Sequence, residues 1–308
     1  MFKVGTVFSG IGAPEVAIKE LGADHTIEFA CDCDKSAKKT YMANHRCKDF
    51  YDDVESVDCS RYQDLDLFVF GFPCKSFSIA GKRKGFQDIR GQLFFKAVSI
   101  IKKIKPKTFI AENVAGIVSL DGGKVFKKVI KTLRGLGYKI YYEILNSLDY
   151  GVPHQRKRVY IVGIRKDLDR GDFIFQKPSH SCISLSSILD KKVPERFDVT
   201  KEFLGKQKVQ KRLSMPDKKY MNCLTETIAR AGSSSEFISY VSAVYHTIGI
   251  YRRPTPRECA RLHGFPESFV LPEAVSVTQR YRQFANTMTI PVLKTLILEL
   301  VSKYFYEG

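Results

Sequence analysis

The sequence lacks several features that would place it in a membrane or secreted class. No stretch approaches the ~18 consecutive apolar residues of a membrane-spanning helix. Met1–Gly10 enters a strand-like run directly, without the charged and apolar regions of a secretory signal. The chain also has no internal repeat and no low-complexity tract. We therefore expect a cytoplasmic protein with no membrane partner.

The eight cysteines include no CxxC pair. Cys31, Cys33, His45 and Cys47 could be read as a metal site, but their spacing matches no common zinc pattern. In a cytosolic chain these thiols should be mostly reduced. The sequence therefore predicts no metal.

Acidic residues are in short supply. The chain has 33 Asp and Glu against 50 Lys and Arg, which gives a formal net charge of +17. A charge of this sign favours polyanionic partners, because neutralising phosphates releases condensed counterions. A lysine-rich surface that binds nothing is equally compatible with the composition.

What the first half of the chain does contain is an alternation of strand-like and helical patterns. The strand-like runs are 3–8, 26–31, 67–72, 108–111, 138–145 and 159–164, and the helical patterns are 14–21, 93–104 and 125–134. Leu67–Phe72 is apolar throughout, as expected of a strand buried on both faces. The alternation predicts an α/β fold with a Rossmann-like, doubly wound, mostly parallel sheet.

The pattern changes near residue 176. From there to about residue 221 the chain is polar, lysine-rich and interrupted by Pro178, Pro194 and Pro216. We predict a second, smaller domain over 176–268, a hinge over 269–282, and a helix from about 283 to 308 that returns to the first domain at 1–175.

The loop after the first strand begins Phe8-Ser9-Gly10-Ile11-Gly12. Two glycines let the backbone approach a ligand closely, but a dinucleotide fingerprint would need a third glycine where Glu15 stands. Acids also surround the next strands: Asp32 and Asp34 follow the second, and Asp52 and Asp53 precede the third. An acid after the second strand can hold ribose hydroxyls. The pattern fits a nucleoside without a pyrophosphate, such as S-adenosylmethionine; a tight turn without a ligand would also explain the glycines.

Cys74 comes directly after the third strand, at the sheet edge where such folds bind ligands. Nearby positive charge raises the thiolate fraction of a cysteine, and a run of basic residues follows: Lys75, Lys82, Arg83, Lys84 and Arg90. The residues fit either a nucleophile beside a basic loop that closes over a polyanion, or a buried structural cysteine beside a solvated loop.

Glu112 ends the next strand at the same edge of the sheet. A carboxyl group buried there would have a raised pKa and could donate a proton at neutral pH. Arg156 and Arg158 share a parity, so both can point to one face of an extended segment. They could bind a base carbonyl, a phosphate or Glu112, and Glu112 could instead be a structural acid paired with a local lysine.

Six segments resemble those of the cytosine-C5 DNA methyltransferases in order and spacing. They are FSGIGAPE at 8–15, GFPCKSFS at 71–78, ENV at 112–114, QRKRVYIVG at 155–163, RRPTPRECARLHGFP at 252–266 and QFANTM at 283–288. The resemblance covers nearly the whole chain outside 176–250, and six ordered motifs are far more specific than any single one.

The resemblance implies a role for each matching position. The catalytic residues would be Cys74 as nucleophile, Glu112 as acid, and Arg156 and Arg158 as the groups that hold substrate and acid. The cofactor S-adenosylmethionine, and its product S-adenosylhomocysteine, would be held by Phe8, Gly10, Ile11, Gly12, Asp32, Cys33, Asp53, Val54, Pro73, Asn286 and Thr287. Contacts to double-stranded DNA would come from Lys75, Ser78, Lys82, Arg83, Lys84, Arg90, Arg230 and Ser233.

Three positions depart from the usual motifs of the family. Lys75 stands where Gln usually follows the nucleophile, Pro254 replaces a Leu, and Ala285 replaces a Gly before Asn286. None of these changes removes a catalytic group, although Lys75 puts details of the loop contacts in doubt.

The resemblance predicts a monomer that methylates carbon 5 of a flipped-out cytosine within a specific duplex sequence. It implies that 1–175 and 283–308 form the catalytic, cofactor-binding domain and that 176–268 form the target-recognition domain. A tRNA cytosine methyltransferase and a catalytically silent DNA-binding module remain as alternatives, and a cognate restriction endonuclease in the same system is left open. In a bacterium the expected location is the cytoplasm, in association with the nucleoid.

Overall fold

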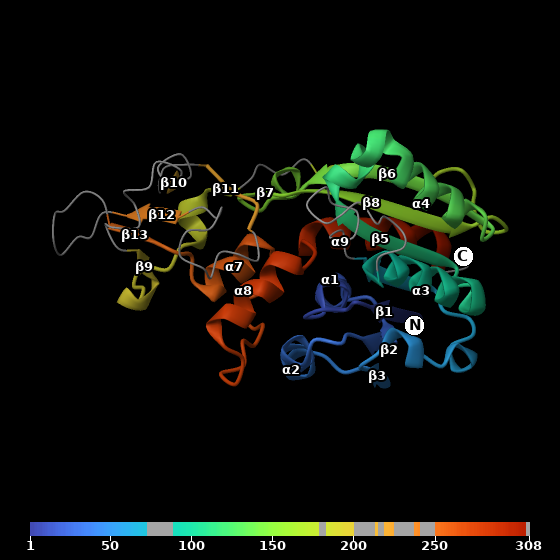
Figure 1. Cartoon of the computed structure of the whole chain (residues 1–308), viewed down its shortest axis with the longest axis horizontal. Coiled ribbons are helices and arrows are strands. Elements are labelled where there is room, and N and C mark those ends of the chain that lie inside the picture. Colours follow the sequence, from blue (N-terminus) through green and yellow to red (C-terminus); the bar gives the residue numbers. More distant parts are fainter. Residues whose placement is uncertain are drawn as a thin grey trace. The chain divides into compact units, whose positions relative to one another are not determined.

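A mostly parallel sheet of seven strands dominates the computed structural model, which describes residues 1–72, 89–178, 183–199, 213–214, 219–224, 237–240 and 250–305. Its strands within these ranges are β1 (Phe2–Val7), β2 (His25–Cys31), β3 (Asp49–Tyr51), β4 (Leu67–Gly71), β5 (Thr108–Val114), β6 (Tyr138–Asn146) and β8 (Lys157–Arg165). They lie in the order β3-β2-β1-β4-β5-β8-β6 (Figure 1).

The pairing of these strands confirms the predicted sheet. β1 is parallel to both β2 and β4, β2 is parallel to β3, and β4 is parallel to β5. β8 is the exception, since it runs antiparallel to β5. The strand order reverses at β1: β2 and β3 lie on one side of it, and β4 and β5 lie on the other. Ligands of such sheets bind at the carboxyl ends of the strands beside this reversal.

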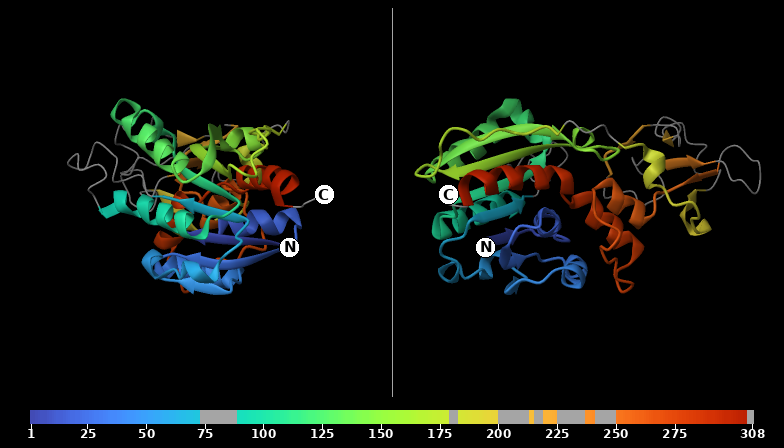
Figure 2. Two further views of the ribbon diagram at one scale, coloured as in Figure 1. Left: turned by 90° about the vertical axis from the view of Figure 1, so that its right-hand side faces the viewer. Right: turned by 180° about the vertical axis from the view of Figure 1, so that it is seen from behind.

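Four helices alternate with the strands: α1 (Ala13–Leu21), α2 (Lys35–Asn44), α3 (Ile89–Ile104) and α4 (Lys124–Arg134). α4 buries Phe126, Val129, Ile130 and Leu133, and these pack with residues of α3 and of the sheet in one hydrophobic cluster. That cluster contains no residue of α1 or of the C-terminal helix α9 (Ile290–Leu300). Figure 2 (left) accordingly shows α3 and α4 on one side of the sheet and α1 and α9 on the other.

Two elements near the N-terminus, β3 and α2, were not predicted from the sequence. β3 has only three residues, too few for a period to be recognised, and α2 is largely polar. Asp52 and Asp53 precede the strand at 67–72, as expected, but they also directly follow β3, which the sequence analysis did not predict. The additional strand places them at the carboxyl end of a strand, beside the end of β2.

The C-terminal segment is not one helix from about residue 283, as predicted. α8 (Val277–Asn286) ends before Thr287, α9 begins at Ile290, and a π-helical turn (Val301–Phe305) follows. Pro291 explains the break, because its ring is tolerated in the first turn of a helix but clashes with the carbonyl four residues earlier.

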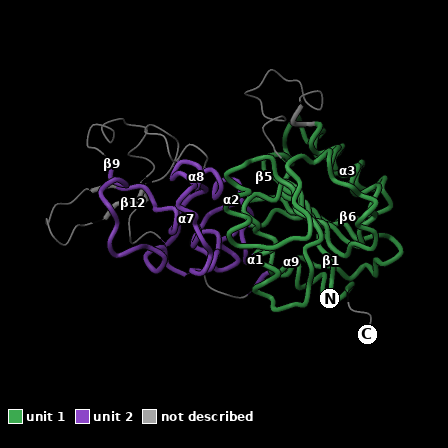
Figure 3. Tube along the Cα trace, turned by 90° about the horizontal axis from the view of Figure 1, so that it is seen from below, with its two compact units in different colours: residues 1–145, 157–176, 292–308 green, residues 146–156, 177–291 purple. Residues whose placement is uncertain are grey.

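The chain divides into two compact units, coloured separately in Figure 3. Unit 1 comprises residues 1–145, 157–176 and 292–308, and unit 2 comprises 146–156 and 177–291. Residues 146–156 and 283–291, which the sequence analysis assigned to the first domain, are thus grouped with unit 2. The assignment of catalysis and target recognition to separate domains stays a prediction.

Within unit 2, short strands form two small sheets among the described residues. One has the order β10 (Leu213–Ser214), β12 (Phe237–Tyr240), β13 (Ile250–Arg252), β9 (Asp198–Val199). The other pairs β7 (His154–Gln155) with β11 (Met221–Asn222) in parallel. Helix α7 (Pro256–Leu262) follows β13.

No single helix of the described residues is long and apolar enough to cross a bilayer. Residues 277–286 and 290–305 meet that test only as a pair bent by 41°. The apolar face of α9 is buried within the protein at Val292, Leu293, Leu296 and Ile297.

Candidate active site

The loop between β1 and α1 has the backbone conformation that its glycines allow. Phe8, Gly10 and Gly12 have φ angles of 55°, 58° and 82°, in the left-handed region that favours glycine. The amide of Ser9 donates to the carbonyl of Cys31 over 3.0 Å, which ties the loop to the end of β2. Among the described residues, nothing lies within 4 Å of the place where a Cβ of Gly10 would be, which leaves space beside the backbone there.

Asp32 lies against this loop at the end of β2. Its Oδ2 accepts from the amide of Gly10 over 2.8 Å, and its Oδ1 accepts from the amide of Asp34 over 2.8 Å. Burial raises the pKa of Asp32, and these two amide hydrogen bonds oppose the rise. The carboxylate therefore holds the loop in place, and its role toward a ribose stays a prediction.

The ends of β2 and β3 bring the other predicted cofactor residues of this unit together. The amide of Asp32 donates to the carbonyl of Tyr51 over 3.1 Å, so the two strand ends are adjacent. Cys33 and Asp53 are exposed there, while Val54 is buried. Asp53 caps the short 3-10 helix Val54–Ser56 by accepting from the amide of Glu55.

Two groups beside the loop, one half-buried and one buried, were not given a role in the cofactor site by the sequence analysis. His45 lies at the end of α2, where its Nε2 is 3.2 Å from the carbonyl oxygen of Ile11 and burial lowers its pKa to about 4. Glu15 is 3% exposed and accepts from the hydroxyls of Thr6 and Tyr41, each over 2.9 Å. A sequence signal existed only for Glu15, as a carboxylate in place of the glycine of a dinucleotide motif.

Glu112 and Arg158 form the candidate catalytic pair of unit 1. In the antiparallel pairing of β5 and β8, Val114 lies opposite Arg158 and Glu112 opposite Tyr160. The Nε of Arg158 lies 3.1 Å from Oε1 of Glu112, and the side chains are 13% and 12% exposed. A guanidinium at this distance holds the carboxyl group in a defined orientation, where it can offer an oxygen or a proton to a substrate.

Asn113 connects this pair to the segment that carries the predicted nucleophile. Its Nδ2 donates to the carbonyl of Phe72 over 2.8 Å, across 41 positions of sequence. Phe72 is the last described residue before Pro73 and Cys74. Asn113 therefore holds the backbone at Phe72, directly after β4, a role that its place in the ENV segment did not reveal.

Many of the predicted residues lie outside the described residues. They are Pro73, Cys74, Lys75, Ser78, Lys82, Arg83, Lys84, Arg230 and Ser233, and Arg90 is described only as part of the backbone of α3. Their assignments stay predictions.

Arg156, Asn286 and Thr287 belong to unit 2. Arg156 lies between β7 and β8 and is 2% exposed. Its Nη2 donates to the carbonyls of Ala285 and Thr287, over 3.1 and 2.8 Å. Asn286 is exposed and Thr287 is buried. The structure thus brings Arg156 to the backbone on either side of Asn286.

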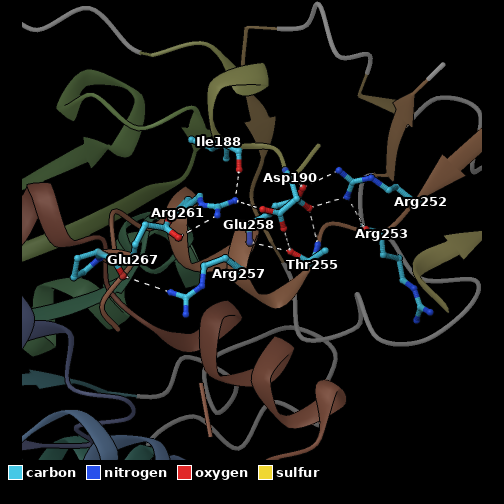
Figure 4. Close-up of polar contacts among 10 residues, drawn as sticks. Ile188, Asp190, Arg252, Arg253, Thr255, Arg257, Glu258, Arg261 and Glu267 are labelled. Atoms are coloured by element: carbon cyan, nitrogen blue, oxygen red, sulfur yellow. Dashed lines mark hydrogen bonds and ion pairs between the residues drawn. The ribbon is translucent and has the colours of Figure 1, made fainter. Parts of the chain in front are cut away.

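The segment 252–267 is ordered by an ion-pair network within unit 2 (Figure 4). Arg252 donates to both carboxylate oxygens of Glu258 over 2.7 Å, and the two side chains are 3% and 0% exposed. Glu258 and Thr255 form a capping box at the start of α7. Asp190 accepts from Arg261 over 2.6 Å and from the hydroxyl of Thr255 over 3.0 Å, which joins the preceding loop to this network.

Fold and site together define a Rossmann-like α/β enzyme with an acid and a guanidinium group at the carboxyl edge of its sheet. The model of the C-5 cytosine-specific DNA methylase family matches residues 2–302. The Type II methyltransferase M.SsoII of Shigella sonnei is 34% identical over 98% of this chain and 80% of its own length. The Type II methyltransferase M.Bsp6I of Bacillus sp. (strain RFL6) is 33% identical over 96% of this chain and 97% of its own.

Solved structures share the fold at lower identity. The Entamoeba histolytica methyltransferase EhMeth has a TM-score of 0.83 at 22% identity and covers 100% of this chain and 99% of its own. The Dnmt2 methyltransferase of S. pombe has a TM-score of 0.80 at 20% identity and covers 98% and 99%.

The chain belongs to the C-5 cytosine-specific DNA methylase family. It is a DNA cytosine methyltransferase, and neither a tRNA methyltransferase nor a catalytically silent DNA-binding module is favoured by these findings. Membership of the family implies dependence on S-adenosylmethionine and action on DNA.

Proposed function

We propose that this chain methylates carbon 5 of a cytosine in a defined duplex DNA sequence through a covalent adduct with Cys74. The observation that carries the proposal is the Glu112–Arg158 pair, at 3.1 Å. Glu112 lies near the end of β5, where it pairs with Gly71 at the end of β4, and Asn113 binds the carbonyl that precedes Pro73-Cys74. An acid, a guanidinium group and the segment with the thiol thereby leave neighbouring strands at one edge.

The described residues of the β1–α1 loop fit a nucleoside-type methyl donor. The open backbone at Gly10, the carboxylate of Asp32 and the absence of a third glycine suit a nucleoside without a pyrophosphate. We assign Phe8, Gly10, Ile11 and Gly12 to its methionine portion, and assign its nucleoside portion to Asp32, Cys33, Asp53 and Val54. Pro73, Asn286 and Thr287 complete the proposed set. When bound, S-adenosylmethionine supplies a methyl group on a positively charged sulfur and leaves as S-adenosylhomocysteine.

The residues of the chain then activate the base. The thiolate of Cys74 adds to carbon 6 of cytosine, which makes the ring enamine-like and carbon 5 nucleophilic. Glu112 donates a proton or hydrogen bond to ring nitrogen 3, and Arg158 holds the oxygen at position 2 while it orients Glu112. After carbon 5 is methylated, a base removes its proton and the bond to Cys74 breaks.

The target base is stacked inside the duplex, so it must flip out at a cost of a few kcal/mol. We assign the contacts that offset this cost to the basic segment 75–90 and to unit 2. Because the named bacterial relatives are Type II methyltransferases, we also propose that the enzyme protects one target sequence within a restriction-modification system. The monomeric state, a cognate endonuclease and a cytoplasmic, nucleoid-associated location stay predictions.

Bisulfite sequencing of plasmid DNA from cells that express the chain tests this function and identifies the target. Protected cytosines should recur at one sequence. Cys74→Ser should abolish protection while the purified variant still binds DNA, and Cys59→Ser, a buried thiol outside the proposed site, should retain it. Absence of protected cytosines with the wild-type protein would refute the function; protection with Cys74→Ser would refute the role of Cys74.

Glu112→Gln tests the acid separately. We expect methyl transfer at saturating donor to fall about 10²- to 10⁴-fold, the usual contribution of a general acid. Binding of S-adenosylhomocysteine, measured by calorimetry, should change little. An equal loss of donor affinity would instead show that Glu112 supports the cofactor site.

A further inference from the structure

Residues of the segment 146–156 form hydrogen bonds with the residues at the break between α8 and α9. Arg156 donates through Nη2 to the carbonyls of Ala285 and Thr287, over 3.1 and 2.8 Å. The Oγ of Ser147 lies 2.8 Å from Oγ1 of Thr289. Both contacts are buried, since Arg156 is 2% and Ser147 2% exposed. Two backbone carbonyls and one side chain of residues 285–289 therefore contact one short segment.

The physical need for these bonds lies in the end of α8. The last carbonyls of a helix have no partner within it and carry the negative end of the helix dipole. α8 has no basic residue in its last turn. The guanidinium of Arg156 supplies both hydrogen-bond donors and a positive charge at this end, while the amide of Ile290 donates to the carbonyl of His263 over 2.8 Å at the start of α9.

The segment 146–156 is itself well anchored. The amide of Ser147 donates to the carbonyl of Arg156 over 3.0 Å, which closes the segment into a loop. β7 pairs with β11, and Nε2 of His154 accepts from the amide of Leu224 over 3.2 Å. Nη1 of Arg156 also lies 3.5 Å from Sγ of Cys223. Because the segment that carries the guanidinium is anchored in this way, Arg156 can fix the backbone conformation at residues 285–287.

We propose that Arg156 is a positioning residue, which holds Asn286 and Thr287 in the conformation that binds the methyl donor. The proposal rests on the proposed function, in which Asn286 and Thr287 belong to the cofactor site. It separates the two arginines of the segment 155–163: Arg158 orients the acid, and Arg156 shapes the cofactor site through the backbone of 285–287.

The test compares Arg156→Lys and Arg156→Gln with the wild type. A lysine keeps the charge but has no planar fork with which to serve two carbonyls, so it should restore only part of the effect. We expect the Kd for S-adenosylhomocysteine, measured by calorimetry, to rise about 5- to 50-fold for Arg156→Gln and less for Arg156→Lys, which corresponds to the loss of one or two hydrogen bonds to a charged group.

Two further readouts separate positioning from catalysis. Deuterium uptake at the amides of 287–290 in the ligand-free protein should increase in Arg156→Gln. The KM for S-adenosylmethionine should rise, while kcat at saturating donor stays within about threefold and DNA affinity within about twofold, because a positioning residue acts on donor binding and not on the chemical step. Arg282→Gln is the matched control, since Arg282 is an exposed arginine on α8, the helix whose end Arg156 contacts.

Thr289→Val provides a second route that does not depend on Arg156. It removes the hydroxyl that contacts Ser147 and should raise the Kd for S-adenosylhomocysteine in the same direction. The proposal is overturned if Arg156→Gln binds S-adenosylhomocysteine like the wild type, with unchanged deuterium uptake, but loses methyl transfer. A wild-type protein that binds the product yet methylates no DNA would instead refute the proposed function.

Discussion

At the scale of single residues, Glu15 is a carboxyl group that the fold removes from water. Glu15 is 3% exposed, and its Oε2 has no hydrogen-bond partner among the described residues. Burial raises its pKa, and the hydrogen bonds from Thr6 and Tyr41 only partly oppose this rise. The folded protein therefore binds a proton here more tightly than the unfolded chain does.

The sign of the resulting pH dependence follows from linkage. A group with a raised folded-state pKa contributes stability that is fully present below its unfolded pKa, about 4.3 for Glu, and lost as pH rises toward the folded value. Glu15→Gln removes this titration. The difference in unfolding free energy between wild type and variant should therefore shift in favour of Glu15→Gln as pH rises, by about 1.4 kcal/mol per pH unit while the group titrates.

Guanidinium chloride unfolding between pH 5 and 8 measures this difference. Glu20→Gln, an exposed carboxylate on the same helix with an ion pair to Lys294 at 3.7 Å, is the control and should differ from wild type by less than ~1 kcal/mol throughout. A wild-type-to-Glu15→Gln difference that does not change with pH would show that Glu15 is ionised in the folded protein.

At the scale of elements, the β1–α1 loop depends on Gly12. Gly12 has a φ of 82°, and a Cβ there would lie 2.3 Å from the ring of His45, which is half-buried and close to the carbonyl of Ile11. Gly22, the C-cap of α1, has a φ of 65° with nothing within 4 Å. A side chain at either glycine would strain the backbone, but only a side chain at Gly12 would also clash with a neighbour. Comparing substitutions at the two positions therefore separates the two effects.

Gly22→Ala should cost about 1–2 kcal/mol of stability, the penalty for a left-handed residue. Gly12→Ala should cost about 2–4 kcal/mol, because the clash with His45 adds to the same strain. It should also weaken S-adenosylhomocysteine binding. Adding His45→Ala to Gly12→Ala should recover part of the loss, and strictly additive effects of the two changes would contradict this account.

A buried ion pair between Arg252 and Glu258 lies at the start of α7 in unit 2. Because Arg252 and Glu258 are 3% and 0% exposed, removing one partner leaves a buried charge without compensation. We expect Glu258→Gln to destabilise the protein by about 3–5 kcal/mol. The nearby pair Arg261–Glu267, in which Glu267 is 66% exposed, is the control; Glu267→Gln should cost at most ~1 kcal/mol. Thermal unfolding with equal losses for both variants would refute the distinction.

The strands that sequence could predict are those with long apolar runs. Leu67–Phe72 and Thr108–Ala111 were placed correctly because burial on both faces leaves a clear pattern. β3 has three half-buried residues and no pattern. The break at Thr287 depends on Pro291 together with contacts from Arg156 and Ser147, which are more than 130 positions away in the chain.

The site could be predicted where a motif indicates both the place of a residue in the sheet and the chemistry of its side chain. A pairing of Glu112 with an arginine of this segment was one of several possibilities that the sequence allowed. The structure pairs Glu112 with Arg158, because Glu112 lies near the end of β5 and Arg158 near the start of β8, at the same edge of the sheet. The shared parity of Arg156 and Arg158 was a weaker guide. The extended segment is interrupted between β7 and β8, so the alternation that would align the two side chains is not maintained.

At the scale of the whole molecule, the net charge of +17 acts through two separate routes. It creates a long-range field that steers DNA toward the protein, and it provides lysines and arginines that contact phosphates directly. Only direct contacts release condensed counterions in proportion to their number. The exposed face of α4 carries Lys124, Lys127 and Lys131, a set equal in charge to Lys82, Arg83 and Lys84 of the predicted DNA-binding segment.

We therefore expect the logarithm of the DNA association constant to fall with the logarithm of salt concentration with a slope of about −5 or steeper, which corresponds to about six neutralised phosphates. Replacing Lys82, Arg83 and Lys84 by Gln should make this slope shallower by about 2 to 3. Replacing Lys124, Lys127 and Lys131 by Gln changes the net charge equally but should shift the slope by less than ~1. Fluorescence anisotropy with a labelled duplex between 50 and 200 mM salt measures all three. Equal changes in the two triple variants would mean that overall charge, and not the segment 75–90, determines DNA binding.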